Sequence, residues 1–145
     1  MEKLLISACL LGAKCKYSGG SNALGKGRLA ALRKKYVLIP VCPETAGGLP
    51  TPREPSERRE GSVFSRSGRD VTKEFERGAQ TALKLCGRFG CSAALLKERS
   101  PSCGSGTIYD GSFTGRAVPG DGVAAEVLKA AGVTVYGESK TDKLI

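Results

Sequence analysis

The 145-residue sequence contains no histidine and no tryptophan. Without histidine, the chain cannot form a Ser-His-Asp or Cys-His catalytic site, nor a histidine-ligated zinc, iron or haem site. Any acid–base chemistry must therefore come from Asp, Glu, Lys, Tyr or Cys side chains. Aromatic residues make up only 6% of the chain, whereas glycine is abundant at 20 residues. This composition favours long, tightly turned loops over a helical bundle.

Long hydrophobic runs are also absent. No apolar run approaches the roughly 18 residues of a membrane-spanning helix. The apolar stretch before Cys9 is shorter than the core of a signal peptide, which takes about 7–15 residues, so we expect a β-strand there. We therefore predict a cytoplasmic protein without a membrane partner, whose thiols stay reduced.

Acidic residues are in the minority. The chain has 23 Lys and Arg against 14 Asp and Glu, which gives a net charge of +9. A positive field attracts anions, so a nucleic-acid partner has to be considered. The basic residues are nevertheless spread from Lys14 to Lys143 without a block of five or six. This spacing favours a solvated basic surface.

Predicted strands and helices alternate along the chain. The strands are short apolar runs at 3–9, 36–41, 91–96 and 133–136. The helices are stretches with helical periodicity or helix-end signals at 24–35, 70–89 and 121–131. The alternation predicts a single α/β domain over residues 1–145, with a mainly parallel sheet of about four strands flanked by helices.

The segments between these elements carry turn signals. Residues 43–68 hold most of the prolines, and we expect an irregular loop there. Residues 108–113, after the third strand, should form a small hairpin, because Asp110-Gly111 suits a type I′ turn. We expect Asp70 to cap the second helix and Gly132 to end the last one.

The six cysteines separate into groups by their position on the predicted fold. None belongs to a C-x-x-C pair, which argues against a zinc ribbon or a thioredoxin-type redox motif. Cys86 lies on the apolar stripe of its helix and Cys91 at the entrance to a buried strand. We expect both to be small hydrophobic core residues.

Three other cysteines follow strands of the predicted sheet. Cys9 and Cys42 end the first two strands, and Cys103 lies in the loop after the third. The carboxyl ends of parallel strands form one edge, where ligands bind, so we favour convergence of these thiols at one site. They could ligate an iron–sulfur cluster with one open iron. Zinc would need a fourth ligand, such as Cys15 or a carboxylate.

Polar residues near these cysteines are candidates for catalysis and binding. Glu44 closely follows the second cysteine and could transfer protons. Ser100 and Ser102 precede the third, where their hydroxyls could position a substrate, relay a proton or simply cap the loop. Arg53 and Lys97 are weaker candidates for substrate binding, because charged loop residues usually face solvent.

Motifs along nearly the whole chain, from about residue 4 to residue 138, resemble those of the thiouracil desulfidase family. The blocks Val41-Cys42-Pro43-Glu44 and Ser100-Pro101-Ser102-Cys103-Gly104, in this order, are specific together. The other matching motifs are Ser7-Ala8-Cys9-Leu10-Leu11-Gly12, Cys15-Lys16-Tyr17, Gly19-Gly20, Gly47-Gly48-Leu49-Pro50-Thr51-Pro52-Arg53, Gly68-Arg69-Asp70-Val71-Thr72, Phe75 with Gly78-Ala79, and Leu96-Lys97-Glu98.

The resemblance implies a [4Fe-4S] cluster with three protein ligands, which carry over to Cys9, Cys42 and Cys103. The fourth iron would capture sulfur from a thiolated pyrimidine such as 2-thiouracil, leaving the oxo base and sulfide. Glu44 and Ser100 carry over as the catalytic residues. The protein would then act in sulfur metabolism.

The resemblance leaves the substrate open in two respects. Relatives often have an acidic residue where this chain has Ser18, so substrate contacts in the first loop are not carried over. Some relatives add a second domain and act on thiolated RNA. For this chain we favour a free base or nucleoside over RNA, and we expect a monomer or weak oligomer.

Two other functions remain open from the residues alone. The chain could be a basic RNA- or nucleotide-binding module whose cysteines are structural. It could also be a zinc-stabilised domain without catalysis. Metal analysis and the salt dependence of RNA binding separate these alternatives.

Overall fold

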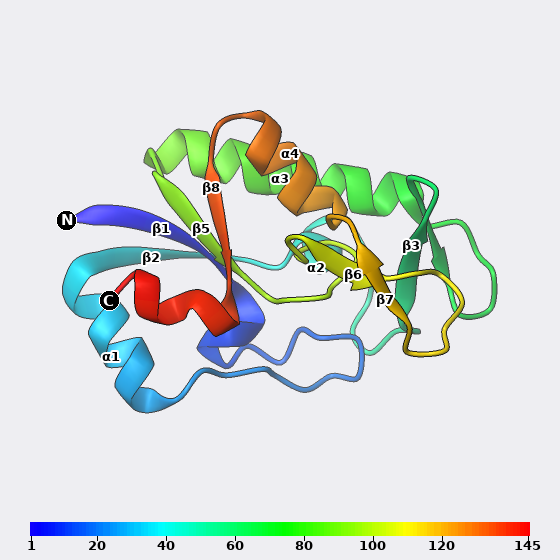
Figure 1. Cartoon of the computed structure of the whole chain (residues 1–145), viewed down its shortest axis with the longest axis horizontal. Helices are drawn as coiled ribbons and strands as arrows, with labels where there is room; N and C mark the ends of the chain where they lie inside the picture. Colours follow the sequence, from blue (N-terminus) through cyan, green and yellow to red (C-terminus); the bar gives the residue numbers. More distant parts are fainter.

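A four-stranded parallel sheet forms the centre of the molecule (Figure 1). In the computed structural model of residues 1–145, the strands lie in the order β2-β1-β5-β8 and all neighbours are parallel. The strands are β1 (Glu2–Ser7), β2 (Tyr36–Val41), β5 (Ala93–Leu96) and β8 (Thr134–Gly137). The predicted α/β class and the predicted four-stranded parallel sheet are confirmed.

Helices cover both faces of this sheet, as Figure 1 shows. On one face lie α3 (Thr72–Phe89) and α4 (Val123–Ala130); on the other lie α1 (Lys26–Lys35) and the 3-10 helix η2 (Glu138–Lys143). None of these helices combines the length and hydrophobicity needed to cross a membrane.

Alternating side chains of the strands divide the core between the two faces. Leu5 packs with residues of α3 and α4, whereas Leu4 and Ile6 pack with Leu32 of α1, and all four are fully buried. This alternation follows from the two-residue repeat of a strand. Because both faces are covered, β1 is a continuous apolar run, the pattern from which it was predicted.

The ends of the predicted elements move by a few residues. β1 ends at Ser7, so Cys9 lies in a short 3-10 helix, η1 (Ala8–Leu11), rather than at the strand end. Helix α3 begins at Thr72 with Val71 in the N-cap position, so the predicted cap at Asp70 is wrong by one residue. The Asp70 carboxylate still accepts the Thr72 N–H at 2.9 Å.

The prediction of an irregular loop at 43–68 is wrong. This segment contains a short helix, α2 (Pro43–Ala46), and an antiparallel hairpin of β3 (Ser56–Arg59) and β4 (Ser62–Ser65). The hairpin turn places Glu60 and Gly61 at φ values of 52° and 83°. A two-residue turn with two positive φ values favours Asn-Gly or Asp-Gly, and the Glu-Gly pair here lacks that signal.

The predicted hairpin after the third strand is present, but its turn is not the predicted one. Its strands are β6 (Thr107–Tyr109) and β7 (Ala117–Pro119), which pair antiparallel. They are joined by the longer loop 110–116 rather than by a two-residue turn at Asp110-Gly111. The two hairpins lie together at one end of the molecule, beyond the carboxyl edge of the sheet (Figure 1).

Helix α2 packs against α3 through two glycines. A Cβ atom on Gly78 would lie 1.7 Å from the carbonyl oxygen of Pro43, and one on Gly47 would lie 1.9 Å from the carbonyl oxygen of Glu74. Both distances are far below van der Waals contact, so only glycine allows the two backbones to approach this closely. The contact fixes α2 at the carboxyl edge of the sheet.

Replacing Gly78 with alanine should lower the free energy of unfolding by about 1–3 kcal/mol, because the added methyl group forces α2 away from α3. Gly87 lies in the same helix, and an added Cβ there would meet nothing within 4 Å. Gly87→Ala should therefore raise the stability by about 0.5–1 kcal/mol, the difference in helix propensity. Denaturant unfolding measures both effects, and a Gly78→Ala variant as stable as Gly87→Ala would contradict the steric account.

Candidate functional site

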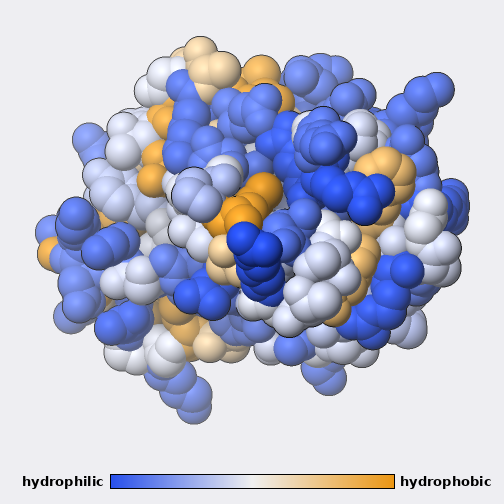
Figure 2. Space-filling model, turned by 45° about the vertical axis from the view of Figure 1, so that its right-hand side comes forward, coloured by the Kyte–Doolittle hydropathy of each residue, from blue (hydrophilic) through white to orange (hydrophobic).

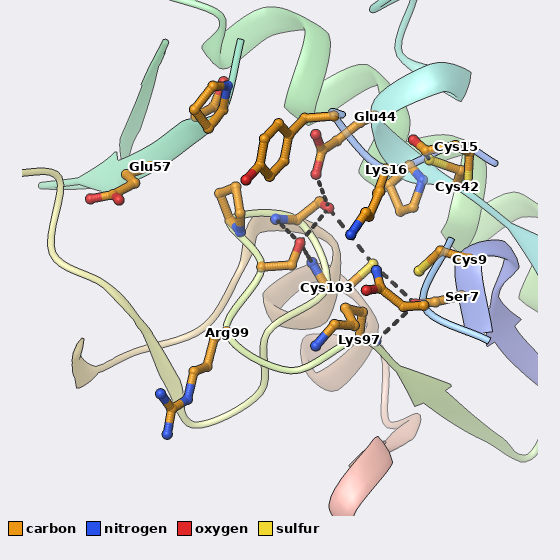
Figure 3. Close-up of a pocket in the computed structure, with 18 of the residues that line it drawn as sticks. Ser7, Cys9, Cys15, Lys16, Cys42, Glu44, Glu57, Lys97, Arg99 and Cys103 are labelled. Atoms are coloured by element: carbon orange, nitrogen blue, oxygen red, sulfur yellow. Dashed lines mark hydrogen bonds between the residues drawn. The ribbon is translucent and has the colours of Figure 1, made fainter. Parts of the chain in front are cut away.

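A cavity of about 460 Å³ lies at the carboxyl edge of the sheet (Figure 3). Its inner wall comes from the segments that follow β1, β2 and β5, and its outer wall from the two hairpins. The structure brings every site residue predicted from the sequence to this cavity: Cys9, Cys42, Glu44, Arg53, Lys97, Ser100, Ser102 and Cys103.

Cys9 and Cys103 line the cavity, and both residues are buried (Figure 3). Burial raises the pKa of Cys103 to about 12, although Ser7 donates a hydrogen bond to its Sγ at 3.3 Å. Burial also raises the pKa of Cys9, and the neighbouring Cys42 raises it further. Both thiols are therefore protonated near neutral pH, and a metal bound by them would have to displace their protons and supply the compensating charge.

Two more thiols line one side of the cavity. The Cys42 Sγ lies 3.8 Å from the carbonyl oxygen of Cys15. Burial and the adjacent Cys42 together raise the pKa of the half-buried Cys15 to about 12. Cys86 and Cys91 lie elsewhere, in the hydrophobic cluster between α3 and the sheet, as predicted. Four of the six cysteines thus reach the cavity.

The donor set fits an iron–sulfur cluster better than a single metal ion. No three His, Cys, Asp or Glu side chains lie close enough together to hold one ion. The cavity instead presents four thiols on its wall, and a cluster binds thiolates at separate iron atoms. All of these donors are soft sulfur atoms, which suit iron–sulfur chemistry.

The Glu44 carboxylate is held on both sides. Arg53 approaches one of its oxygens with Nε and Nη2, each at 3.1 Å, and the Ser102 hydroxyl donates to the other at 2.9 Å. The remaining donors of Arg53 go to Thr51 and to the carbonyl oxygens of Pro50 and Cys15. Only 6% of the Arg53 side chain is exposed, so its guanidinium group holds Glu44 in place.

Ser100 extends this network towards Cys103. Its Oγ accepts the backbone N–H groups of Ser102 and Cys103, at 3.1 and 3.0 Å. A hydroxyl has two acceptor positions and one proton, so the Ser100 proton is available for the Ser102 Oγ at 2.9 Å. Because Ser102 in turn donates to Glu44, the hydrogen bonds run in one direction from Ser100 to the carboxylate.

The loop that carries these serines is fixed to the start of α4. The backbone N–H of Val123 donates to the carbonyl oxygen of Pro101, and that of Ala124 donates to Ser102, both at 2.9 Å. These are N–H groups that the first turn of a helix leaves without partners. A Cβ on Gly122 would lie 2.5 Å from the carbonyl carbon of Ser102, so glycine is required at this contact.

The chain is similar to known proteins along nearly its whole length. The model of a family described as 2-thiouracil desulfurase matches residues 4–140. The chain belongs to the 2-thiouracil desulfurase family. A solved structure of TudS, a [4Fe-4S]-dependent thiouracil desulfidase, superposes with a TM-score of 0.94 at 47% identity, covering 99% of this chain and 95% of that one. The uncharacterized protein YbbK of Bacillus subtilis (strain 168) is 40% identical over 98% of this chain and 99% of its own length.

This member of the 2-thiouracil desulfurase family has cavity residues that sequence reasoning did not identify. Ser7 bonds both the Cys103 thiol and the backbone N–H of Lys97, at 2.9 Å for the latter. Ser7 ends β1 on the same edge of the sheet as the thiols, and this position was the feature of the sequence that could have identified it. Lys16 belongs to the motif Cys15-Lys16-Tyr17 but was assigned no role, and Asn22 comes from the same loop without a motif. Lys97 was predicted, and its Nζ is paired with Glu138 at 2.9 Å.

Replacing Arg53 with lysine should cost about 1–3 kcal/mol of stability, because the three donors of one ammonium nitrogen cannot replace the contacts that the three guanidinium nitrogens make to Glu44, Thr51 and the carbonyl oxygens of Pro50 and Cys15. Arg69→Lys is the matched control. The Arg69 side chain is 72% exposed and approaches Glu74 only at 3.9 Å, so that change should stay within about 0.5 kcal/mol. Denaturant unfolding of the two variants measures the difference. Equal free energies of unfolding would show that the Arg53 contacts do not stabilise the fold.

Proposed function

We propose that this protein removes sulfur from a thiolated pyrimidine nucleobase such as 2-thiouracil, giving the oxo base and sulfide. The single observation that carries the proposal is the cavity in which Cys9, Cys42 and Cys103 meet the Glu44 carboxylate. The similarity to TudS, a [4Fe-4S]-dependent thiouracil desulfidase, supports it. A cavity of about 460 Å³ also suits a small molecule, since ligand pockets occupy roughly 300–1,000 Å³.

We assign Cys9, Cys42 and Cys103 as the three protein ligands of a [4Fe-4S] cluster. When bound, the cluster would supply a Lewis-acidic iron with affinity for the sulfur of the substrate. The cation of Lys16 lines the same cavity and offsets negative charge of the thiolates (Figure 3), whereas the charge of Lys97 is paired with Glu138. The charge of Arg53 is likewise paired, with the Glu44 carboxylate.

The net reaction is a hydrolysis without a change of oxidation state. Water supplies the oxygen of the new carbonyl group, and the sulfur leaves as sulfide with the protons of the water. Glu44 is the group that accepts a proton from the attacking water. Ser100 and Ser102 lie in a hydrogen-bonded line with this carboxylate, so they orient it and carry a proton to or from it.

Cysteine variants test the ligand assignment. Cys9→Ser, Cys42→Ser and Cys103→Ser should each lose most of the iron and acid-labile sulfide found in the wild type after oxygen-free purification, because a serine hydroxyl replaces a thiolate ligand. Cys86→Ser is the control, since Cys86 donates to the Cys91 carbonyl in the core and a hydroxyl can do the same. Full cluster content in the first three variants would refute the assignment.

Glu44→Gln tests the catalytic proposal. The amide keeps the shape of the side chain but cannot accept the proton, so kcat for 2-thiouracil should fall by roughly 10²–10⁴ while cluster content is retained. Glu76→Gln, at an exposed position on α3, should leave kcat unchanged. Absorbance of 2-thiouracil and released sulfide measure the rate. A cluster-loaded wild type that leaves a panel of thiobases intact would refute the substrate class.

A further inference from the structure

The loop 110–116 between β6 and β7 forms part of the outer wall of the cavity. Phe113, at its tip, lines the cavity together with Tyr109 at the end of β6. Phe113 belongs to none of the three hydrophobic clusters that make up the core. Its ring therefore contributes to the cavity rather than to the packing of the fold.

The backbone of Phe113 is in a conformation that a bulky residue rarely adopts. Its φ is +59°, in the left-handed region, where glycine or asparagine is usual. Such a conformation costs free energy and persists only where surrounding contacts impose it, most often at functional sites. Tyr109, by contrast, lies on a regular strand, and Tyr17, the third aromatic residue at the cavity, is 48% exposed.

Glu57 of β3 provides the contacts that hold Phe113. One oxygen of its carboxylate accepts the backbone N–H groups of Gly111 and Phe113, both at 3.0 Å. Figure 3 shows Glu57 at the end of the cavity opposite the cysteines. A carboxylate from one hairpin thus fixes the loop of the other.

Arg66 holds the ring itself. Its guanidinium carbon lies 5.9 Å from the centre of the Phe113 ring, within the range of a cation–π contact, and both residues line the cavity. The ring has no hydrogen-bonding group, so it can recognise a ligand only by its flat apolar surface. A pyrimidine base has a flat ring face that can stack on the flat face of the Phe113 ring.

We propose that Phe113 stacks on the pyrimidine ring of the substrate and that Glu57 is the positioning residue that holds it there. This inference rests on the proposed function and adds the residue that recognises the ring. Every base can stack on an aromatic side chain, because every base has a flat π-face. Such stacking changes the affinity by about tenfold or more. The thiols and Glu44 would then act on a ring held from the outer side of the cavity.

Binding of uracil, which has no sulfur to bind iron, tests stacking separately from catalysis. Ligand-detected NMR titration of the wild type should give upfield ring-current shifts of the uracil H5 and H6 protons. In Phe113→Leu these shifts should vanish and Kd should rise about tenfold. Phe64→Leu is the matched control, because Phe64 carries Arg59 at 5.1 Å from its ring in the neighbouring hairpin and does not line the cavity.

Glu57 variants test the positioning role. Glu57→Ala removes both amide contacts and should lose the ring-current shifts like Phe113→Leu, whereas Glu57→Gln keeps an acceptor oxygen and should restore them. Wild-type shifts in Glu57→Ala would overturn this role. Unshifted uracil protons in the wild type, or an unchanged Kd in Phe113→Leu, would overturn stacking. If a cluster-loaded protein gives the expected uracil shifts but does not desulfurate thiobases, the proposed function is refuted and the stacking proposal is not.

Discussion

The parallel pairing of β1 with both β2 and β5 is the constraint on which the site depends. β1 pairs with β2 from Glu2 opposite Tyr36 to Ser7 opposite Val41, so the two strands end together. β5 lies on the other side of β1 and ends at the same edge. Cys9 and Cys42 follow the ends of β1 and β2 by two residues and one residue, and Cys103 lies in the loop seven residues after β5. Strand pairing therefore brings segments that carry distant thiols to one cavity.

Close backbone contacts then hold the segments that carry the reactive groups. Glycines let α2 rest on α3 and let the Ser100–Gly104 loop rest on α4. The network from Arg53 through Glu44 to Ser102 and Ser100 joins these segments across the cavity. A buried ion pair is costly unless its remaining hydrogen-bonding groups find partners. Here Arg53 and both Glu44 oxygens have them, so the carboxylate is held in one orientation.

The cavity has two halves with different origins. The inner half comes from the parallel sheet and carries the sulfur atoms and Glu44. The outer half comes from the two hairpins, tied together by Glu57 and bearing Phe113 and Arg66. The face turned forward in Figure 2 is mostly hydrophilic, with hydrophobic residues in small separated areas. In the proposed reaction, the inner half carries out the chemistry on sulfur and the outer half recognises the ring that bears the sulfur.

The sequence by itself determined the α/β class, the four parallel strands and the three main helices. Burial on both sheet faces produces apolar runs in the strands and an apolar stripe on α3, whereas residues typical of helix ends mark α1 and α4. It also determined the family, through motifs around Cys42 and Cys103. Only the tertiary structure decided which partners these residues meet. The bond from Ser102 to Glu44 spans 58 residues and the pairing of Lys97 with Glu138 spans 41, and no local pattern encodes such contacts. The tertiary structure also decided the hairpin at 56–65 and the left-handed backbone of Phe113. Local turn residues do not mark either one, and contacts with distant segments stabilise them.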